Sequence, residues 1–545
     1  MSKTKLGEPF GLDSKLVSSI DWAVALGRIL EDIKSDFIFA PHVNFIYRKA
    51  GNELIAEVKN ELNKGGFSPE LPITVEVPKS FRVRVVAPPD RLGPSFSRPG
   101  SILLPKDRLL YQALADQSTT VIFGKSDHKR SFSHQLAPDD SASMFLSTRI
   151  CWNDLQSALK RHSALPKINY IMKLDVANCF GSINQHTLIN TLRDAGYDER
   201  LLSRLENLLL SFTPDRSSRG IIQGIFPSDL FGNFYLTPID QLCEDEGIPT
   251  ARYVDDIYAF LRSIDESEDF LRKLIPGLRS YDLVLNEAKC VLMPKQALIT
   301  EEPDLESLFN AAMEEVSSQL EDAEFNAGYG FQSEWDDESA DTEEEEKEEG
   351  EDIELQATML LFDSIDQYPG HEESIERFCL PIFSAVDSHY ALDHTIASFR
   401  TRPSMTQIYC VYLAKFMTQR RVEDFLVEAA ADHDLLDWQR TWPLAALLQK
   451  PPTTRETIRV ALSILNDANR HETLRAIAAV FIGRHGDITR RRSLIDLYPR
   501  TSDYIQAAIY FSSRSWPSVE RSNAKATWGA QGSLNRLLTV AMGKP

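Results

Sequence analysis

The sequence lacks the features of membrane, secreted and zinc-binding proteins. Its 545 residues include six cysteines and no Cys-x-x-Cys pair, which indicates neither a disulfide framework nor a zinc site. No run approaches the roughly 18 apolar residues that a membrane-spanning helix requires. The first residues, MSKTKLGEPF, lack the apolar core of a signal peptide. We therefore expect a cytoplasmic protein with no membrane partner.

An excess of basic residues, typical of nucleic-acid-binding proteins, is also missing, since the formal net charge is −21. The acidity is confined to one segment. Residues 301–354 contain one Lys or Arg and 23 Asp or Glu. Residues 1–300 contain 36 basic and 37 acidic residues, and residues 355–545 contain 22 and 20. The charge of the whole chain therefore does not exclude a nucleic-acid enzyme.

Apolar periodicity predicts an α+β part followed by an all-α part. We expect an N-terminal region at 1–165 and a second α+β region at 166–300. Residues 301–354 begin with a helical pattern and end as an acidic, partly disordered linker or insert. Residues 355–545 show helical spacing throughout. Their helix spacing is typical of HEAT-like repeats, and a non-repetitive helical bundle fits it nearly as well.

One hairpin is predicted within the first region. The segments LPITVEVP and FRVRVVAP alternate apolar and polar residues on either side of Lys79-Ser80. Such alternation is typical of half-buried strands, so we expect a turn at Lys79-Ser80.

Carboxylates stand at the ends of apolar segments in two motifs. Asp175 follows the apolar run of INYIMKLDV, and Asp255 and Asp256 interrupt RYVDDIYAF. A charge inside a strand costs several kcal/mol unless it is paired or bound to a metal. Adjacent acids repel each other, which indicates a nearby cation. Each motif alone is more often a helix cap or a surface turn, so their combination carries the argument.

A third motif lies between these two, in RGIIQGIFPSDLFGNFYLTPID. Gln223-Gly224 opens a helical apolar pattern that further glycines interrupt. A glycine-rich turn before a helix allows the backbone to approach a nucleotide closely. Packing of the helix against a neighbour would account for the same glycines.

In this order, the motifs resemble the palm motifs of reverse transcriptases. The first matches an Asp followed by an aromatic residue five positions later, the second a Gln-Gly pair, and the third the Tyr-x-Asp-Asp signature. A Lys downstream and an Arg upstream match the next palm motif and the fingers motif. The residues that carry this resemblance are Asp175, Phe180, Gln223, Gly224, Tyr253, Asp255, Asp256, Lys289 and Arg98.

The resemblance implies a right-hand polymerase with α+β fingers and palm, followed by the all-α, HEAT-like region. It implies DNA synthesis from deoxynucleotides by a nucleotidyltransferase that uses two Mg²⁺ ions. Asp175, Asp255 and Asp256 would be catalytic and would bind the metals, together with the backbone carbonyl of Val176.

The resemblance also implies a set of nucleotide-binding residues. Arg98, with Arg84 as a second candidate, would grip the triphosphate, and Lys289 would stabilise or protonate the leaving pyrophosphate. Phe180 would press against the sugar C2′ and favour deoxynucleotides. Gln223, Gly224 and Tyr253 would complete this nucleotide-binding site.

A narrower resemblance comes from the helical region after the palm and from the absence of nuclease, RNase H and retron motifs. The chain resembles bacterial reverse transcriptases of phage defence, or abortive infection, which form symmetric homo-oligomers. This implies a trimer or hexamer, with DNA as product and RNA as one candidate template. Template-independent synthesis and priming by a protein hydroxyl stay open. The alternatives are a mobile-element reverse transcriptase and a non-catalytic nucleic-acid-binding polymerase relic.

Overall fold

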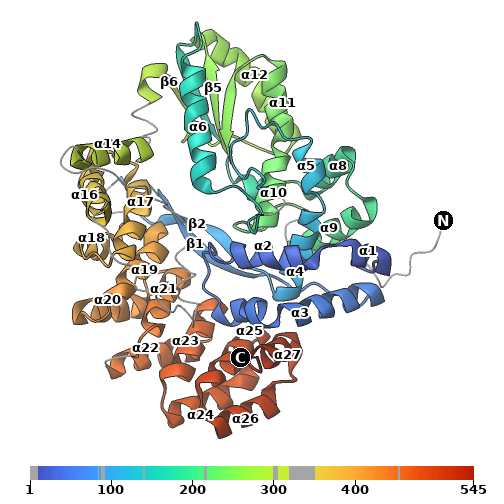
Figure 1. Ribbon diagram of the computed structural model, residues 1–545, viewed down its shortest axis with the longest axis vertical. Coiled ribbons are helices and arrows are strands. Elements are labelled where there is room, and N and C mark those ends of the chain that lie inside the picture. Colours follow the sequence, from blue (N-terminus) through green and yellow to red (C-terminus); the bar gives the residue numbers. More distant parts are fainter. Residues whose placement is uncertain are drawn as a thin grey trace. The chain divides into compact units, whose positions relative to one another are not determined.

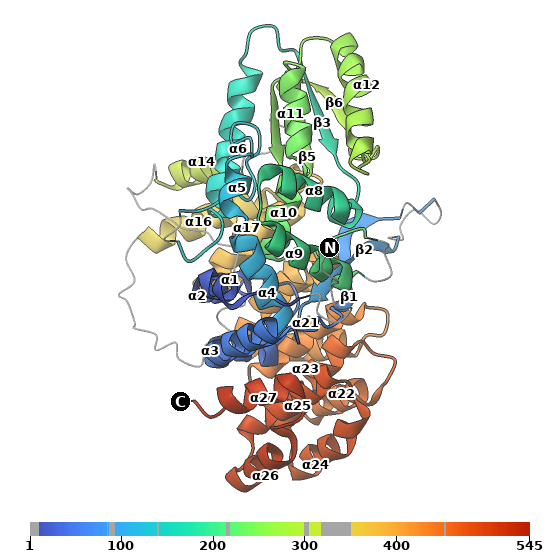
Figure 2. The same ribbon diagram turned by 90° about the vertical axis from the view of Figure 1, so that its right-hand side faces the viewer.

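A computed structural model describes residues 10–83, 85–86, 93–138, 141–213, 218–298, 305–317, 350–451 and 454–544 (Figures 1 and 2). Packing divides the chain into two compact units, each built from three separate segments. Unit 1 comprises residues 1–32, 55–72 and 106–304, and unit 2 comprises residues 33–54, 73–105 and 305–545. The acidic run at 318–349 lies outside the described residues.

Unit 1 combines a small sheet with helices. Its elements in chain order are α1 (Ser14–Ser19), α2 (Trp22–Asp32), the second half of α3 (Pro41–Lys64), α4 (Pro105–Asp116), α5 (Thr119–Phe123), α6 (Thr148–Ser163), β3 (Tyr170–Asp175), α7 (Cys179–Ser182), α8 (Gln185–Ala195), α9 (Glu199–Phe212), α10 (Phe226–Tyr235), α11 (Thr237–Asp245), β4 (Thr250–Tyr253), β5 (Asp256–Leu261), α12 (Ile264–Ser280), β6 (Val291–Pro294) and η2 (Lys295–Ala297).

The sheet of unit 1 has four antiparallel strands in the order β4-β5-β3-β6. One face forms a core with α6, through residues that alternate along the strands. This core contains Ile171, Phe260 and Met293 from three strands and Leu155 and Leu159 from α6. Strands β3 and β5 are buried at nearly every position, so both faces of these strands are covered, and Asp175 and Asp256 lie at the ends of these buried runs.

Local signals start several helices of unit 1. The Asp198 side chain accepts a hydrogen bond from the backbone N–H of Arg200 at the start of α9. The Ser263 side chain accepts one from the N–H of Glu266 at the start of α12. Such caps satisfy backbone donors that have no partner within the helix.

Unit 2 contains a two-stranded hairpin and a long series of helices. Its elements are the first half of α3, β1 (Ile73–Arg82), β2 (Ser95–Ile102), α14 (Leu305–Ser317), α16 (Gly350–Asp363), η3 (Ile365–Gln367), α17 (Glu372–Ala385), α18 (Leu392–Ser398), η4 (Pro403–Met405), α19 (Thr406–Lys415), α20 (Arg420–Ala431), α21 (Asp437–Leu448), α22 (Arg455–Asn466), α23 (Glu472–His485), α24 (Ile488–Leu497), η5 (Tyr498–Arg500), α25 (Asp503–Ser512), η6 (Ser513–Ser515), α26 (Ser518–Trp528) and α27 (Gly532–Ala541).

The described residues after 350 form helices and their connections, as the apolar spacing predicts (Figure 1). Trp438 and Trp442 lie in α21 and are 3% and 0% exposed. No helix in the described ranges has the length and apolar content to cross a membrane.

The predicted turn at Lys79-Ser80 is wrong. Strand β1 continues through these residues to Arg82 and pairs with β2, with an irregularity in register between Pro78 and Arg82. Four residues of β1 span the same interval as two of β2, and such extra residues in one strand are accommodated as a bulge, which breaks the alternation without turning the chain. The local pattern alone looks the same in both cases.

Candidate active site

Two of the predicted catalytic acids face each other across neighbouring strands. Asp175 ends β3 and lies directly opposite Asp256, which begins β5. Side chains of residues directly opposite in an antiparallel pair project from the same face, with Cβ atoms roughly 4.5–5.5 Å apart. Asp175 is only 5% exposed. The fold therefore brings together two carboxylates that are 81 positions apart in the sequence.

Lys289 supplies a positive charge to this pair. Its Nζ donates a hydrogen bond to Oδ1 of Asp175 at 2.7 Å. The segment that carries Lys289 is itself attached to the end of β3, because the N–H of Asn286 donates to the carbonyl of Asp175 at 2.8 Å. An opposite charge at this distance stabilises the ionised form of a buried carboxylate.

Asp255 lies in the tight turn between β4 and β5, which joins Tyr253 to its pairing partner Asp256. The carbonyl of Asp255 accepts a hydrogen bond from the N–H of Val176 at 3.2 Å, so the turn is attached to the end of β3. Val254 has a φ of 54°. A β-branched residue in this left-handed region costs about 1–3 kcal/mol and persists only where neighbouring contacts hold it.

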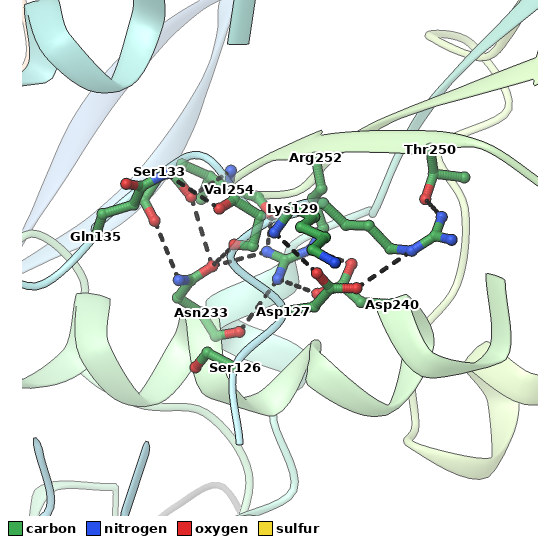
Figure 3. A network of polar contacts seen from close by, with 12 residues as sticks. Ser126, Asp127, Lys129, Ser133, Gln135, Asn233, Asp240, Thr250, Arg252 and Val254 are labelled. Carbon is green, nitrogen blue, oxygen red and sulfur yellow. Dashed lines mark hydrogen bonds and ion pairs between the residues drawn. The ribbon is translucent and has the colours of Figure 1, made fainter. Parts of the chain in front are cut away.

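Those contacts come from a buried polar network behind the turn (Figure 3). The N–H of Val254 donates to Oγ of Ser133 at 2.8 Å, and its carbonyl accepts from Nη1 of Arg252 at 2.9 Å. Nη1 of Arg252 also donates to Oδ1 of Asn233 at 2.8 Å. Nε and Nη2 of Arg252 bind the two carboxylate oxygens of Asp240 at 2.8 and 2.5 Å. The network holds both sides of the strained residue.

The Arg252–Asp240 pair is almost fully buried, with side chains 1% and 5% exposed. Burial acts to lower the pKa of Arg252, and the Asp240 carboxylate more than offsets this, so the pKa lies above its usual value. The sequence motifs did not indicate either residue as part of the site. An Arg between apolar residues of a strand was the available signal, since such a charge requires a partner.

Phe180 connects the first motif to the Gln-Gly motif. It lies in α7, is 8% exposed, and its carbonyl accepts a hydrogen bond from the N–H of Ile221 at 3.0 Å. A Cβ placed on Gly232 of α10 would lie 3.0 Å from the Phe180 ring. Gly224 has a φ of 84°, which glycine adopts at little cost. Glycines in this motif therefore serve both close packing and a turn.

The other predicted nucleotide-binding residues are distributed as follows. Gln223 precedes α10, and Tyr253 ends β4, where its ring packs edge-on against Trp152 at 5.3 Å. Arg98 lies in β2 and belongs to unit 2, whereas the acids belong to unit 1. Arg84 lies outside the described residues.

The donor atoms at the strand ends fit Mg²⁺. This ion prefers carboxylate oxygens and retains waters or substrate phosphates in its shell, so two or three carboxylates suffice. In the described ranges, no three His, Cys, Asp or Glu side chains are grouped as a ready-made metal site. Asp175 instead pairs with Lys289.

Comparison with protein families identifies one domain. The family described as "Reverse transcriptase (RNA-dependent DNA polymerase)" matches residues 94–300, which include the predicted acids, Lys289 and Arg98. This chain therefore contains a reverse transcriptase domain and is a nucleotidyltransferase. The match supports the expected right-hand polymerase fold for this part of the chain.

Comparison with curated proteins found no match. Among solved structures, telomerase from Candida albicans in complex with a fragment of telomeric RNA is similar at 10% identity and a TM-score of 0.28, over 71% of this chain and 67% of that one. Apo telomerase from Candida tropicalis is similar at 12% identity and a TM-score of 0.29, over 78% and 73%. Similarity at this sequence identity and TM-score does not indicate what this protein does.

Proposed function

We propose that this protein is a reverse-transcriptase-type DNA polymerase whose catalytic residues are Asp175, Asp255 and Asp256. The observation that carries the proposal is the cross-strand pair of Asp175 and Asp256, beside a tight turn that holds Asp255. Three acids at two adjacent strand ends are a donor set for divalent cations.

The residues of the site have separate roles in this proposal. Two Mg²⁺ ions, when bound, would activate the primer hydroxyl and neutralise the triphosphate. Asp175 and Asp255 would hold these ions, and Asp256 and the carbonyl of Val176 would complete the site. The buried Phe180 ring excludes a 2′-hydroxyl, while Gln223, Gly224 and Tyr253 line the nucleotide.

Two basic residues act on the phosphates in this proposal. Lys289 bonds Asp175 at 2.7 Å in the structure. In the polymerase reaction it stabilises or protonates the pyrophosphate that leaves. Arg98 grips the triphosphate through its planar guanidinium, which suits bidentate contacts with phosphate.

Nucleotide incorporation tests the proposal. The purified chain, labelled deoxynucleotides and Mg²⁺ are expected to give DNA, and Asp255→Asn and Asp175→Asn to reduce the rate at least 100-fold. These substitutions keep the side-chain shape and remove a charged metal ligand. Asp265→Asn is the matched control, since this exposed acid lies in the first turn of α12. Incorporation within tenfold of the unsubstituted protein in both variants would refute the assignment.

The same assay separates the modes of synthesis. Reactions with and without added RNA, followed by nuclease or protease treatment, show whether the DNA follows a template and whether it is attached to protein.

The narrower role that we propose is phage defence by abortive infection. It is supported by the helical region after 350, which we propose to be HEAT-like, and by the lack of nuclease, RNase H and retron motifs in the sequence. Cells expressing the protein are expected to reduce phage plating, and cells expressing the Asp255→Asn variant to plate phage normally. Equal plating in both strains would remove the defence role and leave the polymerase proposal intact.

A further inference from the structure

Arg98, the proposed triphosphate contact, lies over an aromatic ring. In β2 it pairs with Val77 of β1, and its guanidinium carbon lies 5.7 Å from the centre of the Phe37 ring. A guanidinium at this distance from an aromatic ring is attracted electrostatically by the face of the ring. Phe37 precedes α3 and belongs, like the hairpin, to unit 2.

Phe37 is itself fixed from two directions. A Cβ placed on Gly100, two residues after Arg98, would lie 2.4 Å from a Phe37 ring carbon, so the ring rests against bare backbone of β2. The carbonyl of Phe37 accepts a hydrogen bond from the indole Nε1 of Trp438 at 2.6 Å. Trp438 is 3% exposed and lies in the first turn of α21.

Further bonds attach the hairpin to the same series of helices. Nε2 of His471 lies 2.8 Å from the carbonyl oxygen of Thr74 in β1. Nη2 of Arg82 donates to the carbonyls of Arg400 and Thr401 at 3.1 and 2.7 Å. The hairpin is therefore packed and hydrogen-bonded as part of the C-terminal helical array.

We propose that Phe37 and Trp438 are positioning residues for Arg98, so that the helical array sets the affinity for the incoming nucleotide. This inference rests on the nucleotide-binding role proposed for Arg98. An unrestrained Arg loses rotamer freedom when it grips a phosphate. A guanidinium already held against the Phe37 ring has lost part of that freedom before the nucleotide arrives.

Kinetics of two variants test this proposal. Phe37→Leu keeps an apolar side chain and removes the aromatic face, and Trp438→Phe keeps a ring and removes the N–H. Each is expected to raise KM for deoxynucleotides about 2- to 10-fold while kcat stays within twofold, since the acids are untouched. Phe37→Tyr, which restores the aromatic face, is expected to restore KM.

A double substitution separates positioning from general damage. Arg98→Ala alone is expected to raise KM, and Phe37→Leu added to it is expected to have no further effect, because the residue that it positions is gone. An undiminished effect of Phe37→Leu in the Arg98→Ala background would overturn the proposal, as would an unchanged KM in Arg98→Ala itself.

Trp516→Phe is the matched control for Trp438→Phe. Trp516 is 5% exposed, and its Nε1 donates to the carbonyl of Gly483 at 3.0 Å within the same unit. A KM raised equally by both Trp substitutions would contradict a specific role for Trp438. Titration with a fluorescent deoxynucleotide measures affinity without turnover, so the inference is tested even if incorporation is not observed.

A second inference comes from charge in the last helices. Residues 484–545 contain ten Lys or Arg and four Asp or Glu, in a chain with a net charge of −21. Within the described ranges, five of these basic side chains are exposed and have no carboxylate partner: Arg484, Arg492, Arg500, Arg521 and Lys525.

Several contacts hold the elements that carry these residues together. Helices α24 and α26 lie side by side in both views and are joined by Arg491, whose Nε and Nη2 bind the Glu520 carboxylate at 2.9 and 3.2 Å (Figures 1 and 2). The Tyr498 and Trp528 rings stack at 4.5 Å. Arg521 and Lys525, four positions apart, share one face of α26.

We infer that this basic end binds the phosphate backbone of single-stranded nucleic acid, outside the reverse transcriptase domain. A local excess of positive charge, here along residues 484–545, complements the charge of the template or product of a polymerase. Binding of a labelled oligonucleotide at several salt concentrations, in the Asp255→Asn background, measures the number of phosphate contacts.

The triple variant Arg492→Gln, Arg521→Gln and Lys525→Gln is expected to reduce the slope of log K against log salt by about 2, since each contact contributes about 0.7. Lys450→Gln, Arg455→Gln and Arg459→Gln remove the same charge from exposed sites elsewhere in the array and are expected to leave the slope unchanged. Equal slopes for both triple variants would overturn the inference. So would preferential binding of the surface to vesicles of anionic lipid.

Discussion

Asp240→Asn is expected to destabilise the protein strongly although it alters no catalytic residue. The substitution leaves the Arg252 guanidinium, 1% exposed, without the carboxylate that binds it through two hydrogen bonds. Removing one partner of a buried ion pair costs about 3–5 kcal/mol. Asn retains one acceptor oxygen, so we expect a loss of about 3 kcal/mol in the free energy of unfolding.

Urea unfolding followed by circular dichroism measures this loss, with Glu199→Gln as the control. Glu199 pairs with Arg193 on the surface, with side chains 63% and 44% exposed, and such pairs contribute about 0–1 kcal/mol. The double variant Asp240→Leu with Arg252→Met is expected to recover much of the stability, because no uncompensated charge remains.

Catalysis gives a second readout of the same variant. The Val254 carbonyl loses a well-oriented donor if Arg252 moves, so the turn with Asp255 is expected to relax from its strained conformation. We expect kcat to fall at least tenfold at temperatures where Asp240→Asn is folded. A stability change below about 1 kcal/mol, with unchanged kcat, would refute the reasoning.

Four further predictions address separate parts of the chain. Phe180→Ala is expected to increase ribonucleotide use relative to deoxynucleotides, measured by competition; an unchanged ratio would mean that Phe180 only packs against α10. Deleting residues 335–352 is expected to leave Tm and incorporation nearly unchanged, because so few apolar residues contribute little to a core, and a large drop in Tm would contradict this. His42 is fully buried, and burial lowers its pKa to about 3, so the unfolded chain takes up a proton below about pH 6.5 while the folded one does not. The free energy of unfolding therefore decreases as the pH is lowered, by roughly 2 kcal/mol at pH 5. His42→Leu is expected to make this decrease smaller, as measured by urea unfolding at pH 7 and pH 5. Light scattering is expected to show a trimer or hexamer at micromolar concentration, and a monomer with full activity would remove the oligomer from the proposal.

The strands of the site were predictable because their signals are local. Asp175 follows an apolar run, and Asp255-Asp256 interrupts another, so the ends of β3 and the β4–β5 turn are visible in the sequence. Helices such as α20 and α22 were visible for the same reason, since each buries one apolar face, whereas α21 and α23 are buried at nearly every position.

Partners distant in the sequence were not predictable in this way. Strand β1 pairs with SFSRPGSI, in which Pro99 and Gly100 break any apolar alternation. Gly100 is required instead by the approach of Phe37, a contact across 63 positions. Arg252 indicated that a buried acid exists, but the strand pattern does not specify Asp240.

The interleaved units constrain how this chain folds during synthesis. Phe45, from the first half of α3, packs edge-on against Phe511 at 5.3 Å, and Lys544 bonds Glu53 at 2.8 Å. Ribosomes add about 5–20 residues per second, so roughly 20–90 s pass between the synthesis of these early segments and the synthesis of the last helices. During that interval the first half of α3 lacks its contacts with Phe511 and Lys544, and for most of it the hairpin lacks its contacts with η4, α21 and α23. Chaperone binding to the nascent chain, and aggregation when it is absent, are therefore expected to concentrate on residues 33–54 and 73–105.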